Sequence, residues 1–390
     1  MRSLLFLIGI SLVFSLNGQN AASPKKTGKG KATSTVHYSE PSGKSSEYHD
    51  LLALVRVFNQ WGYIDNTGKI VINPQFDNAK SFAGGLARVK KMGDWGYIDT
   101  KGSYVINPQF DQAENFSEGL ARVMKFRNWG YIDKTGAFLI NPQFGEAEDF
   151  KGGFAIVKKG PDWGVIDTKG NYVINPQFSE LGPFSNGLAR ARLGRDWGYI
   201  DHSGKWVINP QFNDAEDFNG DLARVRKGNE WGYIEKSGTF AINPQFEEAG
   251  IFVNGLAKAK KMRQWGYIDK KGSWTINPQF DEADDFSEGL ASVRKGREWG
   301  YIEAAGTFAI NAQFDEAENF NDGVARVRKE GQWGVIGKKG VYVINPQFDA
   351  LNDFINGFAL VRKAKDWGFI NPKGNIVIDC AYSEAEDFAK

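Results

Sequence analysis

Apolar and polar positions alternate in short runs that are separated by turn-forming residues, and the pattern repeats every 34 residues. In the unit 85–118, the run 86–90 alternates as a half-buried strand does. A short linker leads to a second run at 95–99, a spacing typical of a β-hairpin. Asp99 and Gly102 then bracket a turn, in which Asp can accept hydrogen bonds from backbone amides and Gly can adopt a positive φ.

The third run, 104–106, is apolar on both faces, which predicts a strand buried on both sides. Pro108 lacks the N–H that a continuing ladder needs, so we expect the strand to stop after Ile106 and to be closed by residues 107–110. Residues 111–119 read as a connector without a strand. Each unit is therefore predicted to be a three-stranded β-meander.

A Trp-Gly pair marks every unit and allows the neighbouring backbone to approach closely at the glycine. Ten units fill residues 51–390, so we expect an all-β tandem array with no further domain. The expected architecture is an open solenoid or superhelix, and the alternative is a closed, β-propeller-like ring. Ten units are many for a propeller, and no displaced N-terminal strand closes a circle. The pairs begin at Trp61, Trp95, Trp129, Trp163, Trp197, Trp231, Trp265, Trp299, Trp333 and Trp367.

The succession Trp-Gly-Tyr-Ile-Asp, Gly, Val-Ile-Asn-Pro-Gln-Phe and Gly-Leu-Ala-Arg-Val resembles the bacterial WG repeat, also called the KWG repeat. The resemblance covers residues 51–390 and implies a β-rich repeat protein without a general biochemical activity. Departures are few: Ala312 replaces Pro, Asp221 replaces the Gly before a first strand, and 379–382 departs from Asn-Pro-Gln-Phe in a manner that fits a terminal cap.

The N-terminus resembles a secretory signal peptide over residues 1–18, because a basic residue precedes an apolar run at 4–16 and small residues follow it. That run is shorter than the roughly 20 residues needed to cross a bilayer, although an N-terminal anchor is the alternative. Residues 19–50 read as a flexible basic linker. We therefore expect an exported, periplasmic or extracellular protein, monomeric and without a transmembrane segment in its mature form.

The charge is nearly balanced, with 48 basic and 47 acidic residues, and offers no bulk attraction to nucleic acid or an anionic membrane. Singular reactive residues are scarce. His37 and His49 lie in the linker, His202 lies in a turn, and Cys380 has no second cysteine with which to form a disulfide. Because catalytic roles must converge in one place, we expect no catalytic residue, no cofactor and no enzyme.

Acidic connectors, such as 214–217 and 281–285, raise the question of calcium, which prefers carboxylate and carbonyl oxygens. They lack the closely spaced Asp, Asn and Gly of a dedicated calcium loop. Solvated loops are the expectation, with no metal site.

First strands carry basic residues of the same strand parity, which stacking of the units would align as a basic stripe. Aligned surfaces of repeat arrays are common recognition sites, so the stripe could bind a protein or an acidic polymer. The alternative is a network of ion pairs with the acidic connectors, each contributing about 0–1 kcal/mol. The stripe consists of Arg190, Arg192, Arg224, Arg226, Lys258, Lys260, Arg326 and Arg328.

These patterns predict an interaction scaffold that binds a protein or an acidic polymer along its repeat surface. The alternative is a cell-envelope glycan-binding module that uses exposed aromatic residues, although the period-locked tryptophans are expected in the core. Binding through Arg and Lys should weaken steeply with salt, whereas stacking should not.

Overall fold

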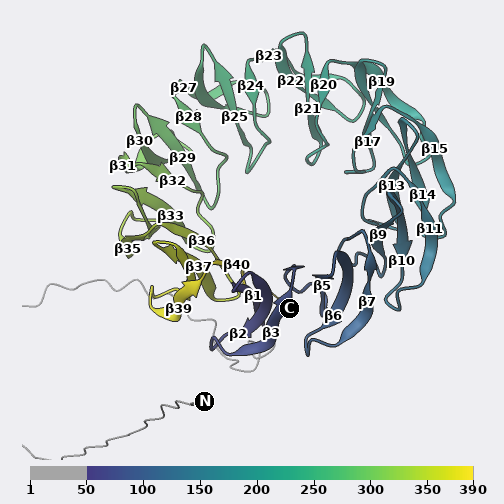
Figure 1. Cartoon of the computed structure of the whole chain (residues 1–390). Helices are drawn as coiled ribbons and strands as arrows, with labels where there is room; N and C mark the ends of the chain where they lie inside the picture. Colours follow the sequence, from purple (N-terminus) through teal and green to yellow (C-terminus); the bar gives the residue numbers. More distant parts are fainter. Residues whose placement is uncertain (1–50, 390) are drawn as a thin grey trace, which may run out of the picture. The chain divides into compact units, whose positions relative to one another are not determined.

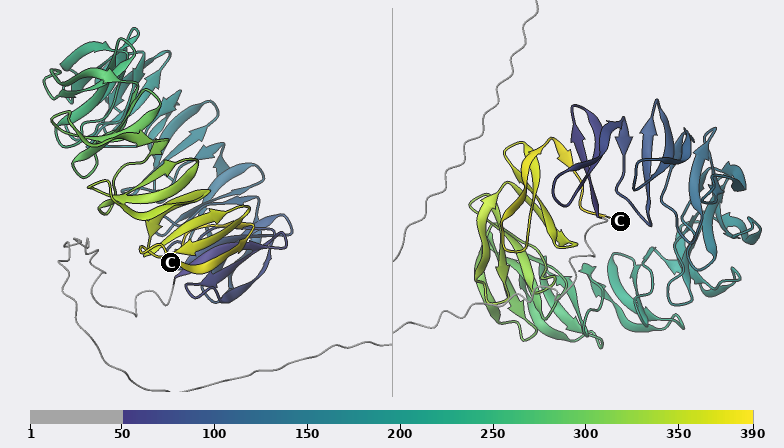
Figure 2. Two further views of the ribbon diagram at one scale, coloured as in Figure 1. Left: turned by 90° about the vertical axis from the view of Figure 1, so that its left-hand side faces the viewer. Right: turned by 90° about the horizontal axis from the view of Figure 1, so that it is seen from below.

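The computed structural model describes residues 51–389, which form β-strands joined by turns, with no helix among them. Ten antiparallel four-stranded sheets, here called blades 1 to 10 in chain order, follow one another around a closed ring (Figure 1). Blade 10, in yellow, lies beside blade 1, in purple, in both further views (Figure 2). The all-β prediction is confirmed. The open solenoid is wrong, and the closed ring that was its alternative is the observed arrangement.

Blade 2 shows how each sheet is built. Its strands are β4 (Asn78–Ala79), β5 (Leu86–Lys91), β6 (Asp94–Asp99) and β7 (Tyr104–Phe110), in that order across the sheet. The short strand β4 belongs to the connector of the preceding unit, where Ala79 pairs with Val89. The predicted three-stranded meander therefore becomes a four-stranded blade. Two residues are too few to show strand alternation, which is why the connector pattern did not reveal this strand.

The other blades repeat this order, from the short connector strand to the third long strand of the unit. Blade 1 contains β1 (Leu52–Val57), β2 (Gln60–Asp65) and β3 (Ile70–Phe76), and its short strand is β40 (Glu384–Ala385). The remaining strands are β8 (Gln112–Ala113), β9 (Ala121–Lys125), β10 (Asn128–Ile132) and β11 (Phe138–Phe144) in blade 3; β12 (Glu146–Ala147), β13 (Phe154–Lys159), β14 (Asp162–Asp167) and β15 (Tyr172–Phe178) in blade 4; β16 (Glu180–Leu181), β17 (Ala189–Leu193), β18 (Asp196–Ile200) and β19 (Trp206–Phe212) in blade 5; β20 (Asp214–Ala215), β21 (Leu222–Lys227), β22 (Glu230–Glu235) and β23 (Phe240–Phe246) in blade 6; β24 (Glu248–Ala249), β25 (Leu256–Lys261), β26 (Gln264–Asp269) and β27 (Trp274–Phe280) in blade 7; β28 (Glu282–Ala283), β29 (Leu290–Lys295), β30 (Glu298–Glu303) and β31 (Phe308–Phe314) in blade 8; β32 (Glu316–Ala317), β33 (Val324–Lys329), β34 (Gln332–Gly337) and β35 (Tyr342–Phe348) in blade 9; and β36 (Ala350–Ile355), β37 (Phe358–Lys363), β38 (Asp366–Ile370) and β39 (Ile376–Tyr382) in blade 10.

The ring is closed by the end of the last unit rather than by an N-terminal strand. The strand β40 pairs with β1, and the backbone N–H groups of Leu52 and Ala389 each donate to the other residue's carbonyl at 3.0 Å. The amide of Glu386 also donates to the carbonyl of Leu54 at 2.9 Å. Each blade therefore borrows its first strand from the unit before it, and blade 1 borrows from the tenth unit.

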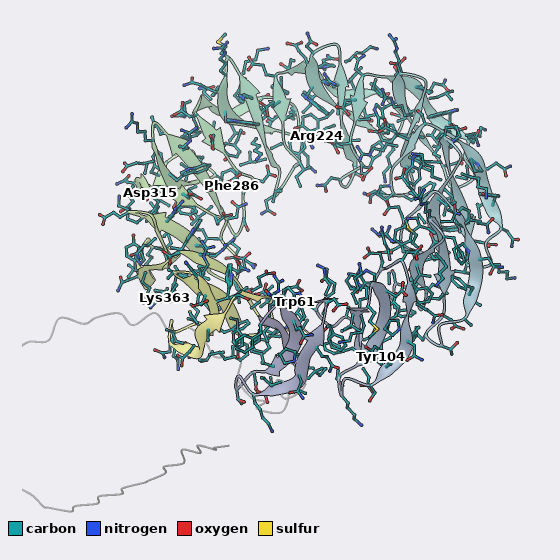
Figure 3. All side chains as sticks on the ribbon, viewed as in Figure 1. Trp61, Tyr104, Arg224, Phe286, Asp315 and Lys363 are labelled. Carbon is teal, nitrogen blue, oxygen red and sulfur yellow. The ribbon has the colours of Figure 1, made fainter. Side chains whose placement is uncertain are left out.

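The third strand of each unit lies on the outer side of the ring, and Tyr104 of β7 marks that side (Figures 1 and 3). Tyr104 is 42% exposed and Val105 is 43% exposed, so the predicted two-sided burial of this strand is wrong. The predicted end at Ile106 is wrong as well. The strand continues to Phe110 through a bulge that contains Pro108, since Tyr97 pairs with Ile106 but Trp95 pairs with Phe110. Proline is tolerated there because the strand is the edge of the sheet.

The Trp-Gly pair accommodates this bulge. A Cβ atom on Gly96 would lie 2.5 Å from the carbonyl oxygen of Ile106 and 2.6 Å from the backbone nitrogen of Pro108. The predicted close backbone approach is confirmed. The core lies between successive blades: Tyr97 and Phe110 of blade 2 pack with Val123 of blade 3, while Trp95 is only partly buried.

The predicted signal peptide at 1–18 and the linker at 19–50 lie outside the described residues. Within residues 51–389, no helix is long and apolar enough to cross a membrane.

A candidate binding cleft between blades 4 and 5

The eight residues of the predicted basic stripe form two rows on the first strands, and all eight are held by the protein itself. Arg190, Arg224, Lys258 and Arg326 reach from one blade to the connector of the next. Each donates to a connector carbonyl there: those of Ala215, Ala249, Ala283 and Leu351, respectively. Carboxylates neutralise this row as well, as in the 3.0 Å ion pair of Arg190 with Asp217 and the 2.7 Å pair of Arg326 with Asp353.

The second row pairs with acids of its own blade. Arg226 lies 3.5 Å from Asp214, and Lys260 lies 2.6 Å from Glu248. Arg192 and Arg328 likewise pair with Glu180 and Glu316. The ion pairs expected as the alternative to a binding stripe are therefore present. Binding of a partner by these residues stays a prediction. Carboxylates of the protein already offset most of their positive charge.

In blades 2, 3, 5, 6 and 7, two side chains seal the junction with the next blade. In blade 3, Arg122 donates to the carbonyl of Ala147, and the hydroxyl of Tyr131 donates to the carbonyl of Glu148 at 2.7 Å. Blades 2, 5, 6 and 7 make the same two contacts, with lysine in place of arginine in blade 7. The tyrosine is almost completely buried, and this burial raises its pKa far above the ordinary value.

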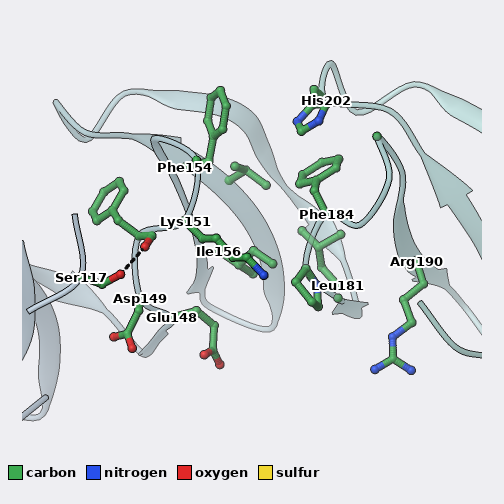
Figure 4. Close-up of a pocket in the computed structure, with 16 residues that line it drawn as sticks. Ser117, Glu148, Asp149, Lys151, Phe154, Ile156, Leu181, Phe184, Arg190 and His202 are labelled. Carbon is green, nitrogen blue, oxygen red and sulfur yellow. Dashed lines mark hydrogen bonds between the residues drawn. The ribbon is translucent and has the colours of Figure 1, made fainter. Parts of the chain in front are cut away.

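Blade 10 has neither side chain, but the buried Leu360 and Phe369 occupy the two positions. Blade 4 lacks both seals as well. Ile156 stands at the arginine position and Val165 at the tyrosine position, and the facing connector reads Leu181-Gly182-Pro183 in place of Ala-Glu-Asp. A cleft of about 700 Å³ opens between blades 4 and 5 (Figure 4). Its apolar wall consists of Phe154, Ile156, Val165, Leu181, Phe184 and His202.

The junction between blades 6 and 7 shows which change opens the cleft. Its connector, Gly250-Ile251, also lacks the carboxylates, yet Arg224 and Tyr233 are present and leave a cavity of only about 10 Å³. Loss of the connector acids alone therefore does not open a cleft. At blade 4 the tyrosine is replaced by the smaller Val165, whereas at blade 10 a buried aromatic ring, Phe369, remains at this position.

Aromatic packing changes at the same place. In blade 3 the ring of Tyr131 lies 4.7 Å from that of Phe150, the equivalent of Phe184. Phe184 has no tyrosine to pack against and instead stacks on His202 at 4.1 Å, with 17° between the ring planes. His202, which the sequence suggested was only a turn residue, forms part of the cleft wall. The sequence does point to this cleft, because positions 156, 165 and 182 all differ from the repeat pattern and all lie at one junction between blades.

The WG-containing repeat matches ten stretches that together span almost all of the chain from Trp61 onward, namely residues 61–93, 95–125, 129–160, 163–195, 197–231, 231–261, 265–298, 299–333, 333–365 and 367–390. The chain belongs to the WG-repeat family. The resemblance inferred from the Trp-Gly signature is thereby confirmed.

Other comparisons add little to the family assignment. Among curated proteins, none matches the sequence. A crystal structure of the eukaryotic initiation factor is similar over 75% of this chain and 94% of its own, at 12% identity and a TM-score of 0.46. Hsv2 from Kluyveromyces lactis is similar over 56% of this chain and 90% of its own, at 8% identity and a TM-score of 0.33. These values are too low to bear on function.

The rim of the cleft in this WG-repeat protein is polar (Figure 4). Asp149 is paired with Arg122 at 2.8 Å, and Arg190 is paired across the next junction. No salt bridge to a described residue holds Glu148 or Lys151. Besides the paired Asp149 and Arg190, the cleft therefore presents the Glu148 carboxylate and the Lys151 ammonium group at the mouth of an apolar interior, a composition typical of sites that bind an organic group.

The other singular residues do not gather. Cys380 lies in blade 10, where burial raises the pKa of its thiol, and His37 and His49 lie outside the described residues. Among residues 51–389, no three His, Cys, Asp or Glu side chains are placed to hold a metal ion.

The acidic connectors of the WG-repeat protein lead to a pH prediction. Burial raises the pKa of Asp285, so the folded state retains this proton at pH values where the unfolded chain has lost it. Stability contributed at this site therefore falls as pH rises above the ordinary Asp pKa. Asn319 shows that an amide fits at the equivalent place in the next unit. We therefore expect the unfolding free energy of the Asp285→Asn variant, minus that of the native protein, to increase as pH rises. Urea unfolding of both proteins between pH 4 and pH 7 measures this difference; a difference that shrinks with pH would contradict it.

Proposed function

We propose that this WG-repeat protein is a non-catalytic interaction protein that binds a partner protein by taking a bulky apolar side chain into the cleft between blades 4 and 5. The observation that carries the proposal is the replacement of both sealing side chains by smaller ones, Ile156 for arginine and Val165 for tyrosine, where a cleft opens between blades 4 and 5. A volume of about 700 Å³ falls within the usual range for ligand sites.

Charge and geometry favour a peptide segment over an acidic polymer. The cations of the predicted stripe are already paired with carboxylates of the protein. The cleft interior is apolar, and the rim groups Glu148 and Lys151 can pair with charged groups that flank an inserted side chain. Export, expected from residues 1–18, would place this partner in the periplasm or outside the cell.

A second candidate is glycan binding on the outer strands. Tyr104 is 42% exposed, Tyr172 is 38% exposed and Phe138 is 36% exposed, at equivalent places in successive blades. Exposed aromatic rings of this kind can stack on sugar faces. The tryptophans of the Trp-Gly pairs were expected in the core, but most are only partly buried. They are poorer candidates, because arginine and lysine side chains lie over several of their rings, as Arg190 and Arg192 do over Trp197 at 5.4 and 5.9 Å.

Filling the cleft tests the proposal. The double variant Ile156→Arg/Val165→Tyr recreates the side chains that seal the junction of blades 6 and 7 over an equally small connector. We expect the native protein to bind Gly-Gly-Phe-Gly-Gly at least about tenfold more strongly than Gly-Gly-Ala-Gly-Gly, because one buried aromatic side chain contributes about 1.5–3 kcal/mol and 1.4 kcal/mol is a factor of about ten in the dissociation constant. The double variant should bind the phenylalanine peptide at least tenfold more weakly, by NMR titration of the capped peptides.

Ile156→Leu keeps the apolar wall and is the matched control, which should bind as the native protein does. Equal binding of the phenylalanine peptide by the native protein and the double variant would disprove the cleft as the site. Binding of a chitin tetrasaccharide that survives cleft filling and is lost in Tyr104→Ala/Tyr172→Ala would instead support the glycan candidate.

A further inference from the structure

Three neighbouring blades present a bulky apolar side chain at the tip of their first hairpin. Phe58 is 97% exposed, Met92 is 91% exposed and Phe126 is 81% exposed. They join β1 to β2, β5 to β6 and β9 to β10, which are equivalent places in blades 1, 2 and 3. Equivalent hairpins of consecutive blades point to the same face of the ring, so these apolar tips form a row along one sector of that face.

The backbone at these tips is unfavourable for the residues that occupy it. Phe58, Met92 and Phe126 have φ values of 48°, 54° and 52°, and the residue after each also has a positive φ. Such two-residue turns favour Gly, Asn or Asp, and a bulky side chain there costs conformational energy. Blades 4, 5, 6 and 8 have Gly at this position, namely Gly160, Gly194, Gly228 and Gly296. The fold does not require apolar tips, so their strain and exposure point to a function.

Their geometry indicates what they contact. Each tip protrudes singly and has polar neighbours, so the row is not a continuous apolar face of the kind a stable protein interface needs. A lipid interface accepts separate apolar side chains without matching their shape. Lys91 directly precedes Met92, and Lys125 and Arg127 flank Phe126, whereas Phe58 lies between Val57 and Asn59. The ammonium groups of Lys91 and Lys125 donate to the backbone carbonyls of Gln75 and Gln109. Long cationic side chains flanking apolar ones can extend to the headgroups while the apolar groups insert.

Local charge makes the attraction to anionic lipid weak. The carboxylate of Asp77 accepts a hydrogen bond from the amide of Met92 at 2.7 Å, and Asp94 lies in the same hairpin, so the lysines of blade 2 are offset. Met262 in blade 7 has a similar tip, but the glycine tips of blades 4, 5 and 6 separate it from the row. We propose that Phe58, Met92 and Phe126 insert into the interface of a lipid bilayer and dock the ring on it through blades 1 to 3, driven by apolar burial.

The test replaces the three tips by the residue that the turn prefers. In Phe58→Asn/Met92→Asn/Phe126→Asn, we expect the thermal unfolding midpoint to rise by about 2 °C, because turn strain is relieved. Binding of the full chain to phosphatidylcholine vesicles, measured by flotation, should fall at least tenfold. The matched control Gly194→Asn/Gly228→Asn/Gly296→Asn changes three tips elsewhere on the same face and should keep native binding.

Added phosphatidylglycerol should strengthen native binding only slightly, and 0.5 M salt should leave it on phosphatidylcholine intact. Absence of native binding to either kind of vesicle would overturn the proposal. So would equal binding by the triple tip variant, or binding that is confined to anionic vesicles and lost in salt. Self-association of the native chain that only the tip variant abolishes, without vesicle binding, would assign the row to a protein contact instead.

Discussion

Replacing Gly232 by alanine is expected to lower the free energy of unfolding by about 3 kcal/mol, because the added Cβ has no space that relaxation can easily provide. It would lie 2.6 Å from the carbonyl oxygen of Ile242 and 2.7 Å from the backbone nitrogen of Pro244. Both atoms belong to the backbone of the outer strand of the same blade. Relief requires moving the proline bulge away from the Trp-Gly strand, which breaks the pairing of Trp231 with Phe246. Urea denaturation followed by tryptophan fluorescence measures the loss.

Gly337 provides the matched control, since it also lies in the second strand of a unit but has room for a Cβ. Its nearest neighbour in the described structure would be a methyl group of Val343 at 3.9 Å, and its φ is not in the left-handed region. Gly337→Ala should change the unfolding free energy by less than about 0.5 kcal/mol or stabilise slightly. Similar losses for both alanine variants would show that the close backbone approach does not determine the role of the Trp-Gly pair.

Deleting residues 383–390 is expected to open the ring and destabilise it by more than the roughly 3–5 kcal/mol typical of losing one buried phenylalanine. Phe388 is buried and its ring lies 4.7 Å from that of Phe369. The deletion also removes the strand that pairs with β1 and the 2.6 Å hydrogen bond from the Ser81 hydroxyl to Glu386. The unpaired edge of β1 should then promote self-association.

Small-angle scattering and light scattering distinguish the outcomes. The native chain should give a compact ring profile, and the shortened chain a more extended or oligomeric one. Arg56→Ala removes the ion pair with Glu384 but keeps the strand pairing, and should cost no more than about 1 kcal/mol, since both side chains are partly exposed. A shortened chain that remains monomeric with an unchanged profile would disprove closure through β40.

Period and turn chemistry could be predicted from the sequence because each depends on a few neighbouring residues. The turn at 99–102 is an example: the Asp99 carboxylate accepts the amides of Lys101 and Ser103 at 2.9 Å, and Gly102 has a φ of 83°. The close approach at Gly96 was likewise visible as a glycine fixed beside a large ring.

Features set by more than one unit could not be predicted in this way. Whether the array closes depends on the angle between blades and on the pairing of Val55 with Ala385, more than 300 residues apart in the chain. The apolar third strand suggested two-sided burial, but its place at the outer edge leaves Val105 exposed. The reactive residues that occur once gave no sign of the cleft, because Ile156 and Val165 are informative as apolar departures from the repeat rather than as reactive groups.

Because every sheet takes its short strand from the preceding unit, each blade begins one connector earlier in the chain than the 34-residue sequence repeat does. An in-frame tandem duplication of any 34 consecutive residues inside the array would thus supply all the strands of one additional blade, wherever its breakpoints fell. The chain can lengthen or shorten by recombination between its near-identical units without leaving a half-built sheet. The angle between neighbouring blades, which must adjust for the last connector to meet β1 again, then sets which unit numbers natural selection retains.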